Sequence, residues 1–165
     1  MFERLNTPQE AYNYKLGAAL RMEQEVLEIL DSNIKEAKDD EVRQLFERHR
    51  LESEGHVVNL EQVFELFGWK ADDSPCPAIQ GLEKEGSANA KKTDDSLLDS
   101  VLLQSAVEVE HHEIGVYENL IINARAMGRE DVVRVLERNL EQEAQALQLA
   151  KTTQERVAAV TRKAA

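Results

Sequence analysis

The chain has 165 residues, of which 42% are apolar and 32% are charged, and it contains only 7 glycines and 3 prolines. This length fits one ordinary domain, and so few turn-forming residues among many helix-favouring ones argue against a β-sandwich or β-barrel. The 32 acidic residues outnumber the 20 basic ones, which gives a net charge of −12. That charge argues against a protein that binds the nucleic-acid backbone or adsorbs to an anionic membrane.

Cysteine content and hydropathy bear on the compartment. Cys76 is the single cysteine and has no partner for an internal disulfide, which suits a reducing compartment. No apolar run approaches the roughly 20 residues that cross a bilayer, and no basic segment followed by an apolar stretch opens the chain, so we expect no signal peptide. These features predict a soluble, cytoplasmic, all-helical protein with a single domain over residues 1–165.

The first half of the chain predicts two long helices. Thr7 can cap a helix whose first residue is Pro8 and whose third is Glu10, which forms a capping box. Apolar residues at helical spacing then extend this helix over residues 8–37. Asp39 or Asp40 is the expected cap of the next helix, over residues 40–67, which Gly68 ends.

The second half predicts a crossover and two more long helices. Residues 69–95 contain Pro75-Cys76-Pro77 and polar stretches, so we expect a crossover with one short helix near residues 78–91. The sequence Ser96-Leu97-Leu98-Asp99 matches a second capping box and predicts a helix over residues 96–127, which Gly128 stops. The last helix is expected over residues 130–160, with a frayed tail behind it.

The connection lengths predict how these helices assemble. Four long helices with two short connections and one long middle connection are typical of a ferritin-like four-helix bundle with one long crossover. A weak internal repeat supports two related hairpins, because residues 22–28 resemble residues 112–118 and residues 51–54 resemble residues 140–143. The predicted fold class is therefore all-α.

Charged residues interrupt the apolar stripe of each long helix. The four glutamates on these stripes are Glu23, Glu52, Glu113 and Glu143. Burying four unpaired carboxylates would cost several kcal/mol apiece. Each glutamate lies near the middle of its own helix, and the two in each hairpin match in level to within about 3 Å at ~1.5 Å of rise per residue. We therefore expect the four carboxylates to meet at mid-bundle.

Carboxylates that converge in an apolar core, together with one or two histidines, are the ligands of a di-iron or di-manganese site. His49 and His56 lie three residues before and four after Glu52, so either can share its site. Glu110 lies on a row next to Glu113. For Tyr117, one turn beyond Glu113, packing is the favoured role over a hydrogen bond to a carboxylate. Any one of these glutamates alone fits a surface-edge residue equally well.

The chain resembles the YciE/YciF family of ferritin-like proteins over nearly its whole length. The matching segments are residues 49–53 and 60–65, residues 76–82, Val109-Glu110-His111-His112-Glu113-Ile114 with Tyr117, and residues 140–143. The resemblance implies a ferritin-like bundle, usually a homodimer, with a di-metal centre and a link to bacterial stress responses.

Carried over by position, the resemblance implies a set of metal ligands, namely Glu23, His49, Glu52, Glu110, Glu113 and Glu143. The chain departs from the Glu-x-x-His pattern of ferritin-like sites, because it has His49-x-x-Glu52 and Glu110-x-x-Glu113 instead. Such a carboxylate-rich site favours oxygen-preferring metals. Gln142 replaces an acid that is common in the family, a change that matters little if the side chain points outward.

Two functional hypotheses follow. In the first, the protein holds two divalent metal ions, Fe before Mn, with Glu52 and Glu143 as bridges, and sequesters iron or reacts with O₂ or H₂O₂ under stress. In the second, it is a metal-free dimeric helical scaffold or interaction protein whose core glutamates are protonated or paired with Arg21, Arg48 or Arg138.

Overall fold

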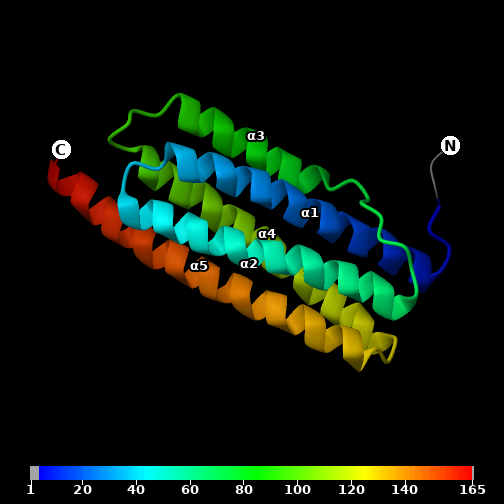
Figure 1. Ribbon diagram of the computed structural model, residues 1–165. Helices are drawn as coiled ribbons and strands as arrows, with labels where there is room; N and C mark the ends of the chain where they lie inside the picture. Colours follow the sequence, from blue (N-terminus) through cyan, green and yellow to red (C-terminus); the bar gives the residue numbers. More distant parts are fainter. Residues whose placement is uncertain (1–3, 165) are drawn as a thin grey trace.

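Five α-helices make up the part of the chain that the computed structural model describes, residues 4–164, with side chains up to residue 160 (Figure 1). They are α1 (Pro8–Glu36), α2 (Asp40–Phe67), α3 (Pro77–Lys91), α4 (Leu98–Ala126) and α5 (Glu130–Ala164), and no strand occurs among the described residues. In this part of the chain, no helix combines the length and the apolar character that crossing a bilayer requires.

The four long helices form two antiparallel hairpins that pack against each other (Figure 1). Helices α1 and α2 form the first hairpin, and α4 and α5 form the second; α1 lies against α4, and α2 lies against α5. Because α2 ends at the opposite end of the bundle from the start of α4, the chain must cross its full length, and α3 covers α1 and α4 on the way. The predicted bundle with one long crossover and one short crossover helix is confirmed.

Helix ends follow the capping signals in most places. The Thr7 hydroxyl accepts a hydrogen bond from the Glu10 backbone N–H while the Glu10 carboxylate accepts one from the Thr7 N–H, so the first capping box is present. The Asp39 carboxylate caps α2 by accepting hydrogen bonds from the backbone N–H groups of Glu41 and Val42. Gly68 follows the last residue of α2, and Gly128 lies in the turn after α4. Their φ angles of 70° and 69° are left-handed, a conformation that glycine adopts without strain.

The second predicted capping box is wrong. Helix α4 begins at Leu98, without a side-chain cap, because both members of the expected box are engaged elsewhere. The Ser96 hydroxyl donates to Asp94, and the Asp99 carboxylate accepts hydrogen bonds from the backbone N–H groups of Lys38 (2.9 Å) and Asp39 (3.0 Å). Asp99 therefore joins the start of α4 to the α1–α2 connection. The expected end of the last helix at residue 160 is also wrong, because α5 continues to Ala164.

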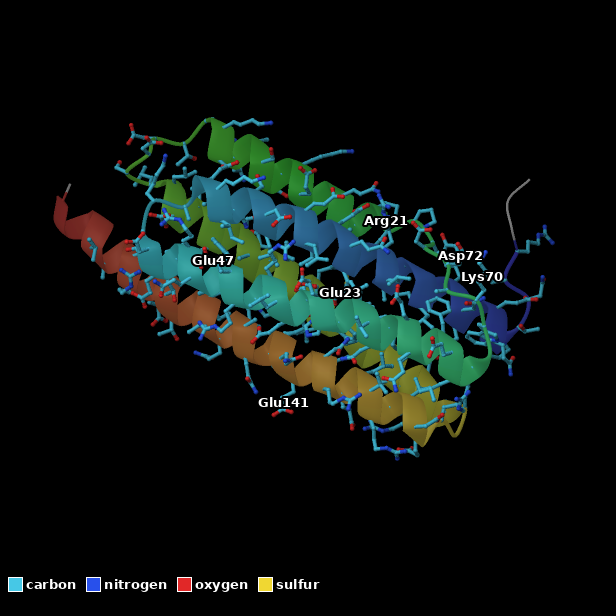
Figure 2. All side chains as sticks on the ribbon, in the orientation of Figure 1. Arg21, Glu23, Glu47, Lys70, Asp72 and Glu141 are labelled. Atoms are coloured by element: carbon cyan, nitrogen blue, oxygen red, sulfur yellow. The ribbon has the colours of Figure 1, made fainter. Side chains whose placement is uncertain are left out.

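The apolar core fills the space between the long helices and is interrupted by charge at one level. Fully or almost fully buried apolar side chains lie along its length, among them Leu16, Met22, Phe46, Leu60, Phe64, Leu103, Leu120 and Leu136. At mid-height the core contains glutamates that are equally buried. Figure 2 shows Glu23 in the middle of the bundle, whereas Glu47 and Glu141 project from its surface.

Replacing Asp99 by Ala tests the connection between the two hairpins. Two backbone N–H groups lose their carboxylate acceptor, so the free energy of unfolding should fall by about 1–3 kcal/mol. Urea denaturation followed by circular dichroism measures the change. The matched control is Asp95→Ala, which removes only a surface ion pair with Lys38 and should change stability by less than about 0.5 kcal/mol; equal losses in both variants would contradict the assignment.

Candidate metal centre

Six ionisable side chains from the four long helices converge at mid-bundle, each at most 4% exposed. They are Glu23 from α1, His49 and His56 from α2, Glu110 and Glu113 from α4, and Glu143 from α5. Their helices bring them to the same level because α1 and α2, like α4 and α5, are antiparallel and of similar length around this point. Sequence positions more than a hundred residues apart therefore share one small volume.

The six side chains fall into two groups that have one member in common. The outer group is His49, Glu110, Glu113 and Glu143, and the inner group is Glu23, His56 and Glu143. Within each group, one nitrogen or oxygen atom of every member lies within 4.8 Å of those of the others. Glu143 belongs to both groups, as expected of a carboxylate that bridges two ions.

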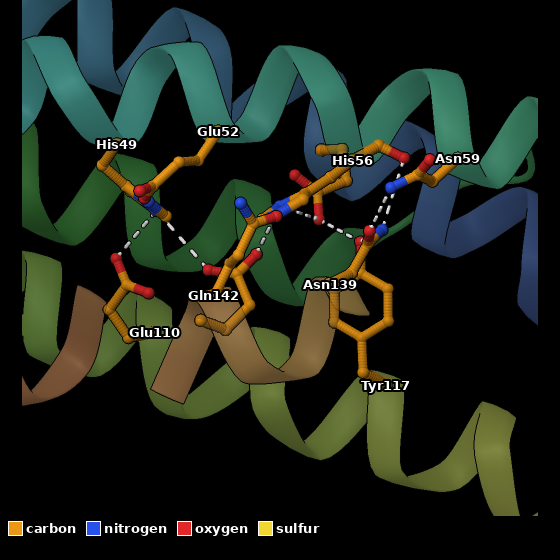
Figure 3. A network of polar contacts seen from close by, with 10 residues as sticks. His49, Glu52, His56, Asn59, Glu110, Tyr117, Asn139 and Gln142 are labelled. Atoms are coloured by element: carbon orange, nitrogen blue, oxygen red, sulfur yellow. Dashed lines mark hydrogen bonds and ion pairs between the residues drawn. The ribbon is translucent and has the colours of Figure 1, made fainter. Parts of the chain in front are cut away.

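His49, the histidine of the outer group, has one ring nitrogen beside Glu52, outside the cluster, and the other beside the clustered carboxylates (Figure 3). His49 Nδ1 lies 3.4 Å from a carboxylate oxygen of Glu52, outside the cluster. Its Nε2 lies 3.0 Å from Glu110 Oε1 and 3.6 Å from Glu143 Oε2. Burial lowers the pKa of His49, but hydrogen bonds with Glu110 and Glu52 outweigh this and raise it well above its ordinary value, so both nitrogens carry protons in the metal-free protein. If a cation replaced the Nε2 proton, the acceptor beside Nδ1 would keep the other proton there.

His56 repeats the arrangement with its nitrogens exchanged. Its Nε2 lies 3.0 Å from the side-chain oxygen of Gln142, while its Nδ1 lies 2.8 Å from Glu143 Oε1 and 3.5 Å from Glu23 Oε1. The Gln142 side chain does not point outward: it is half-buried and contacts the imidazole ring, so the replacement of the family's acid matters here. An amide in this place supplies the acceptor without adding a further negative charge.

A chain of polar side chains orients the remaining inner carboxylate. The Tyr117 hydroxyl donates a hydrogen bond to Glu23 Oε1 and accepts one from Asn139 Nδ2 at 3.0 Å. Asn139 in turn accepts one from Asn59 Nδ2 at 2.6 Å (Figure 3). The prediction that Tyr117 only packs is therefore wrong. It is fully buried and has a definite hydrogen-bonding role.

The cluster carries more negative charge than its own residues compensate. Burial raises the pKa of Glu113 well above its ordinary value, and the neighbouring charges of Glu143, Glu23 and Glu110 raise it further. Burial also raises the pKa of Glu143 to about 8, against the opposing hydrogen bond with His56. Four carboxylates face two imidazoles, so protonation of both rings would still leave two negative charges.

No arginine or lysine among the described residues is buried near the cluster. Arg21 forms ion pairs with Glu25 and Asp73 at the surface, and Arg48 and Arg138 are exposed. The hypothesis that these arginines compensate the core glutamates is therefore wrong. Positive charge at mid-bundle has to come from bound protons or from cations.

Hydrogen-bond accounting points the same way. Four buried carboxylate oxygens of the cluster have neither a hydrogen bond nor an ion pair with another described residue, namely Glu23 Oε2, Glu110 Oε2 and both oxygens of Glu113. The oxygens of Glu143 have only the imidazole nitrogens of His49 and His56 as partners. Leaving buried polar atoms without partners costs about 1–3 kcal/mol each. Carboxylates with imidazoles suit iron, manganese or zinc, and two divalent cations would balance four carboxylates, so the residues fit a di-metal group.

One predicted ligand lies outside the cluster. The Glu52 side chain is 31% exposed and belongs to neither group, so its expected position in the core is wrong. The reason is helical phase: the buried row of α2 runs from Phe46 through Ser53 to Leu60 in steps of seven, and Glu52 lies about 100° away from that row. The structure brings together the other five predicted residues, namely Glu23, His49, Glu110, Glu113 and Glu143.

Sequence reasoning left His56 out of the ligand set, although its position allowed a role there. It lies seven residues after His49, on a second buried row of α2 that also contains Val42 and Val63, and that spacing was a usable signal. Asn59 and Asn139 gave a weaker signal, because a polar residue on an apolar stripe does not reveal which residue of another helix it contacts.

Comparison with known proteins agrees with this geometry. The profile described as "Domain of unknown function (DUF892)" matches residues 7–163. YcfI from Rhodopseudomonas palustris is 32% identical, with a TM-score of 0.88, and the match covers 92% of this chain and 98% of that one. The E. coli stress protein YciF is 22% identical, with a TM-score of 0.88 and coverage of 93% and 98%. The predicted resemblance to the YciE/YciF family is confirmed.

A more distant match concerns the fold. Ferritin-like, diiron-carboxylate proteins from Bacillus anthracis are 16% identical, with a TM-score of 0.71, and the match covers 91% of this chain and 99% of that one. The all-α, ferritin-like fold class is therefore confirmed. No curated protein sequence matches the chain.

The raised pKa values predict how the metal-free protein responds to pH. The pKa of Glu143 rises from 4.5 to about 8, so its cost to the fold grows between these two pH values. Burial lowers the pKa of His56, but hydrogen bonds with Glu143 and Glu23 outweigh this and raise it from 6.5 to about 10. Its contribution is complete below pH 6.5 and is lost toward pH 10.

Both effects have the same sign, so the melting temperature of chelator-treated protein should fall between pH 6 and pH 9. Differential scanning calorimetry measures it, and surface carboxylates do not interfere because they titrate well below pH 6. The Glu143→Gln variant should show a flatter profile. A melting temperature that rises over this range in the metal-free wild type would contradict the assignment.

Proposed function

The chain belongs to the DUF892 family, and we propose that it is a ferritin-like di-metal carboxylate protein that binds two divalent ions, iron before manganese, at mid-bundle. The observation that carries the proposal is the pair of ligand groups that share Glu143 and leave four buried carboxylate oxygens without a partner. Burying carboxylates without a compensating partner lowers the stability of the fold, and bound cations would remove that cost.

Each residue has a distinct task in this proposal. Glu143 contributes to both ion positions, the other five side chains to one each. Glu52 and Gln142 hold the two imidazole rings, so that the inward nitrogens keep their lone pairs toward the ions. Tyr117 holds Glu23, and the surrounding apolar side chains keep bulk water away. Two iron ions held there would supply a pair of electrons to a small oxidant.

The biological role follows from that chemistry. A site that takes up Fe(II) and passes electrons in pairs to O₂ or H₂O₂ would lower both free iron and oxidant, which fits a role in stress. The E. coli protein YciF, which has the same fold, is described as a stress protein. The homodimer and the cytoplasmic location stay predictions of the sequence, as does the lack of nucleic-acid and membrane partners.

Metal stoichiometry tests the proposal. Plasma mass spectrometry after anaerobic Fe(II) loading should find about two ions per chain in the wild type. Because Glu143 belongs to both groups and Glu23 only to the inner one, Glu143→Ala should lose both ions and Glu23→Ala one. The matched control is Glu141→Ala, an exposed glutamate two residues from Glu143 on α5 (Figure 2), which should keep both.

The alternative function, a metal-free helical scaffold, gives a different result. It predicts less than about a tenth of an equivalent of metal after loading in every variant, since no ligand set would be engaged. It also predicts that chelation leaves the melting temperature unchanged. Full stoichiometry in Glu143→Ala would instead reject the ligand assignment.

Metal binding should reverse the pH response of the metal-free protein. The ions compete with protons for the carboxylates and imidazoles, so affinity rises with pH, and bound metal stabilises the fold by an amount that grows with affinity. With excess Mn(II), the melting temperature should rise from pH 6 to pH 8, whereas it falls in the chelated protein. Parallel slopes with and without Mn(II) in calorimetry would contradict the proposal.

A further inference from the structure

A small cavity connects the surface with one side of the cluster. It has a volume of about 100 Å³, lies between α2, α4 and α5, and ends at His49 and Glu110 of the outer group. Apolar side chains, including Leu45, Phe46 and Leu149, form part of its walls, and Arg48 and Gln145 also line it. Since a water molecule occupies about 30 Å³, the cavity has room for about three waters or one partly hydrated ion.

The two ligand groups differ in their distance from this cavity. His49 and Glu110 line it, whereas Glu23, His56 and Glu143 do not and are fully buried. On the far side, the inner group is closed by the hydrogen bonds of Tyr117 and Asn139. An ion that comes from this cavity therefore reaches the outer group before the inner one.

Glu52 lies between the solvent and the outer group. Its side chain is 31% exposed, it lines the cavity, and one carboxylate oxygen lies 3.4 Å from His49 Nδ1 (Figure 3). Glu52 and Glu110 give the lining of the cavity two carboxylates against the single guanidinium of Arg48, so the passage attracts cations.

We propose that this cavity is the port through which divalent cations reach the centre, and that Glu52 is the first ligand they meet. The inference rests on the proposed function and adds the route and the order of loading. The outer group fills before the inner one and releases its ion first. Glu52 acts during passage and is not one of the ligands that keep the ions.

The experiment follows Co(II) uptake by the metal-free protein through the visible absorption of Co(II) in a stopped-flow instrument. In Glu52→Gln, which keeps an acceptor oxygen near His49 but removes the charge, the uptake rate should fall about tenfold, the lower end of the range for charge focusing in a cleft. The final number of bound ions should stay equal to that of the wild type. The matched control is Glu47→Gln, an exposed glutamate on α2 away from the cavity (Figure 2), which should load at the wild-type rate.

A second pair of variants tests the passage itself. Ala146→Leu puts a larger side chain into the cavity wall and should slow both uptake and chelator-driven release, while Ala144→Leu on the exposed face of α5 should change neither. Ala106→Leu, which fills the same cavity from α4, replaces Ala146→Leu if the latter fails to fold. Release from the wild type should occur in two phases, and Glu23→Ala should lack the slow one.

The outcomes separate the two proposals. Wild-type rates in Glu52→Gln and in a folded cavity-filling variant, with unchanged stoichiometry, would overturn the port and leave the metal function intact. A lower final stoichiometry in Glu52→Gln would also overturn it, because Glu52 would then be a ligand that keeps an ion. Failure of the wild type to bind Co(II), Mn(II) or Fe(II) would overturn both.

Discussion

The burial of four carboxylates with only two imidazoles at one level of the bundle is the constraint on which the rest of the structure depends. Glu23, Glu110, Glu113 and Glu143 sit where a helical bundle ordinarily places leucine, and no buried arginine or lysine among the described residues offsets them. The cost of such an arrangement is several kcal/mol per ion unless protons or cations compensate it. In the metal-free protein the pKa values of Glu113 and Glu143 are raised, so protons reduce the negative charge. The proposed ions would reduce it by binding to the carboxylates.

The surrounding structure holds these groups in place without adding charge. The side chains that contact the cluster from outside are neutral on the inner side, namely Gln142, Tyr117, Asn139 and Asn59, and the one added carboxylate, Glu52, lies toward solvent. Farther away, Asp99 ties the start of α4 to the α1–α2 connection, which maintains the register of one hairpin against the other. A shift of one residue in that register would move a ligand by about 1.5 Å.

Most of the buried polar cluster could be predicted from local sequence because three glutamates interrupt strongly apolar stripes. Glu23, Glu113 and Glu143 each lie at a position that the 3.6-residue period directs inward, and the prediction for them is right. The period is less decisive on α2, where Glu52 and Ser53 are neighbours and either can be assigned to the core row. In the structure Ser53 is buried and the Glu52 side chain is partly exposed. The residues that α2 contributes to the cluster are therefore His49 and His56.

The sequence by itself determined the number of long helices, most of their ends and the presence of a polar layer at mid-bundle, because capping residues and helical periodicity are local properties. Tertiary structure alone decided which nitrogen of each histidine faces the cluster, how Tyr117, Asn139 and Gln142 reach their partners, and which ligand group lies beside the cavity. It also decided that Asp99 binds another hairpin instead of capping its own helix. These features depend on the distances and rotations between helices, and packing across the whole bundle sets those quantities.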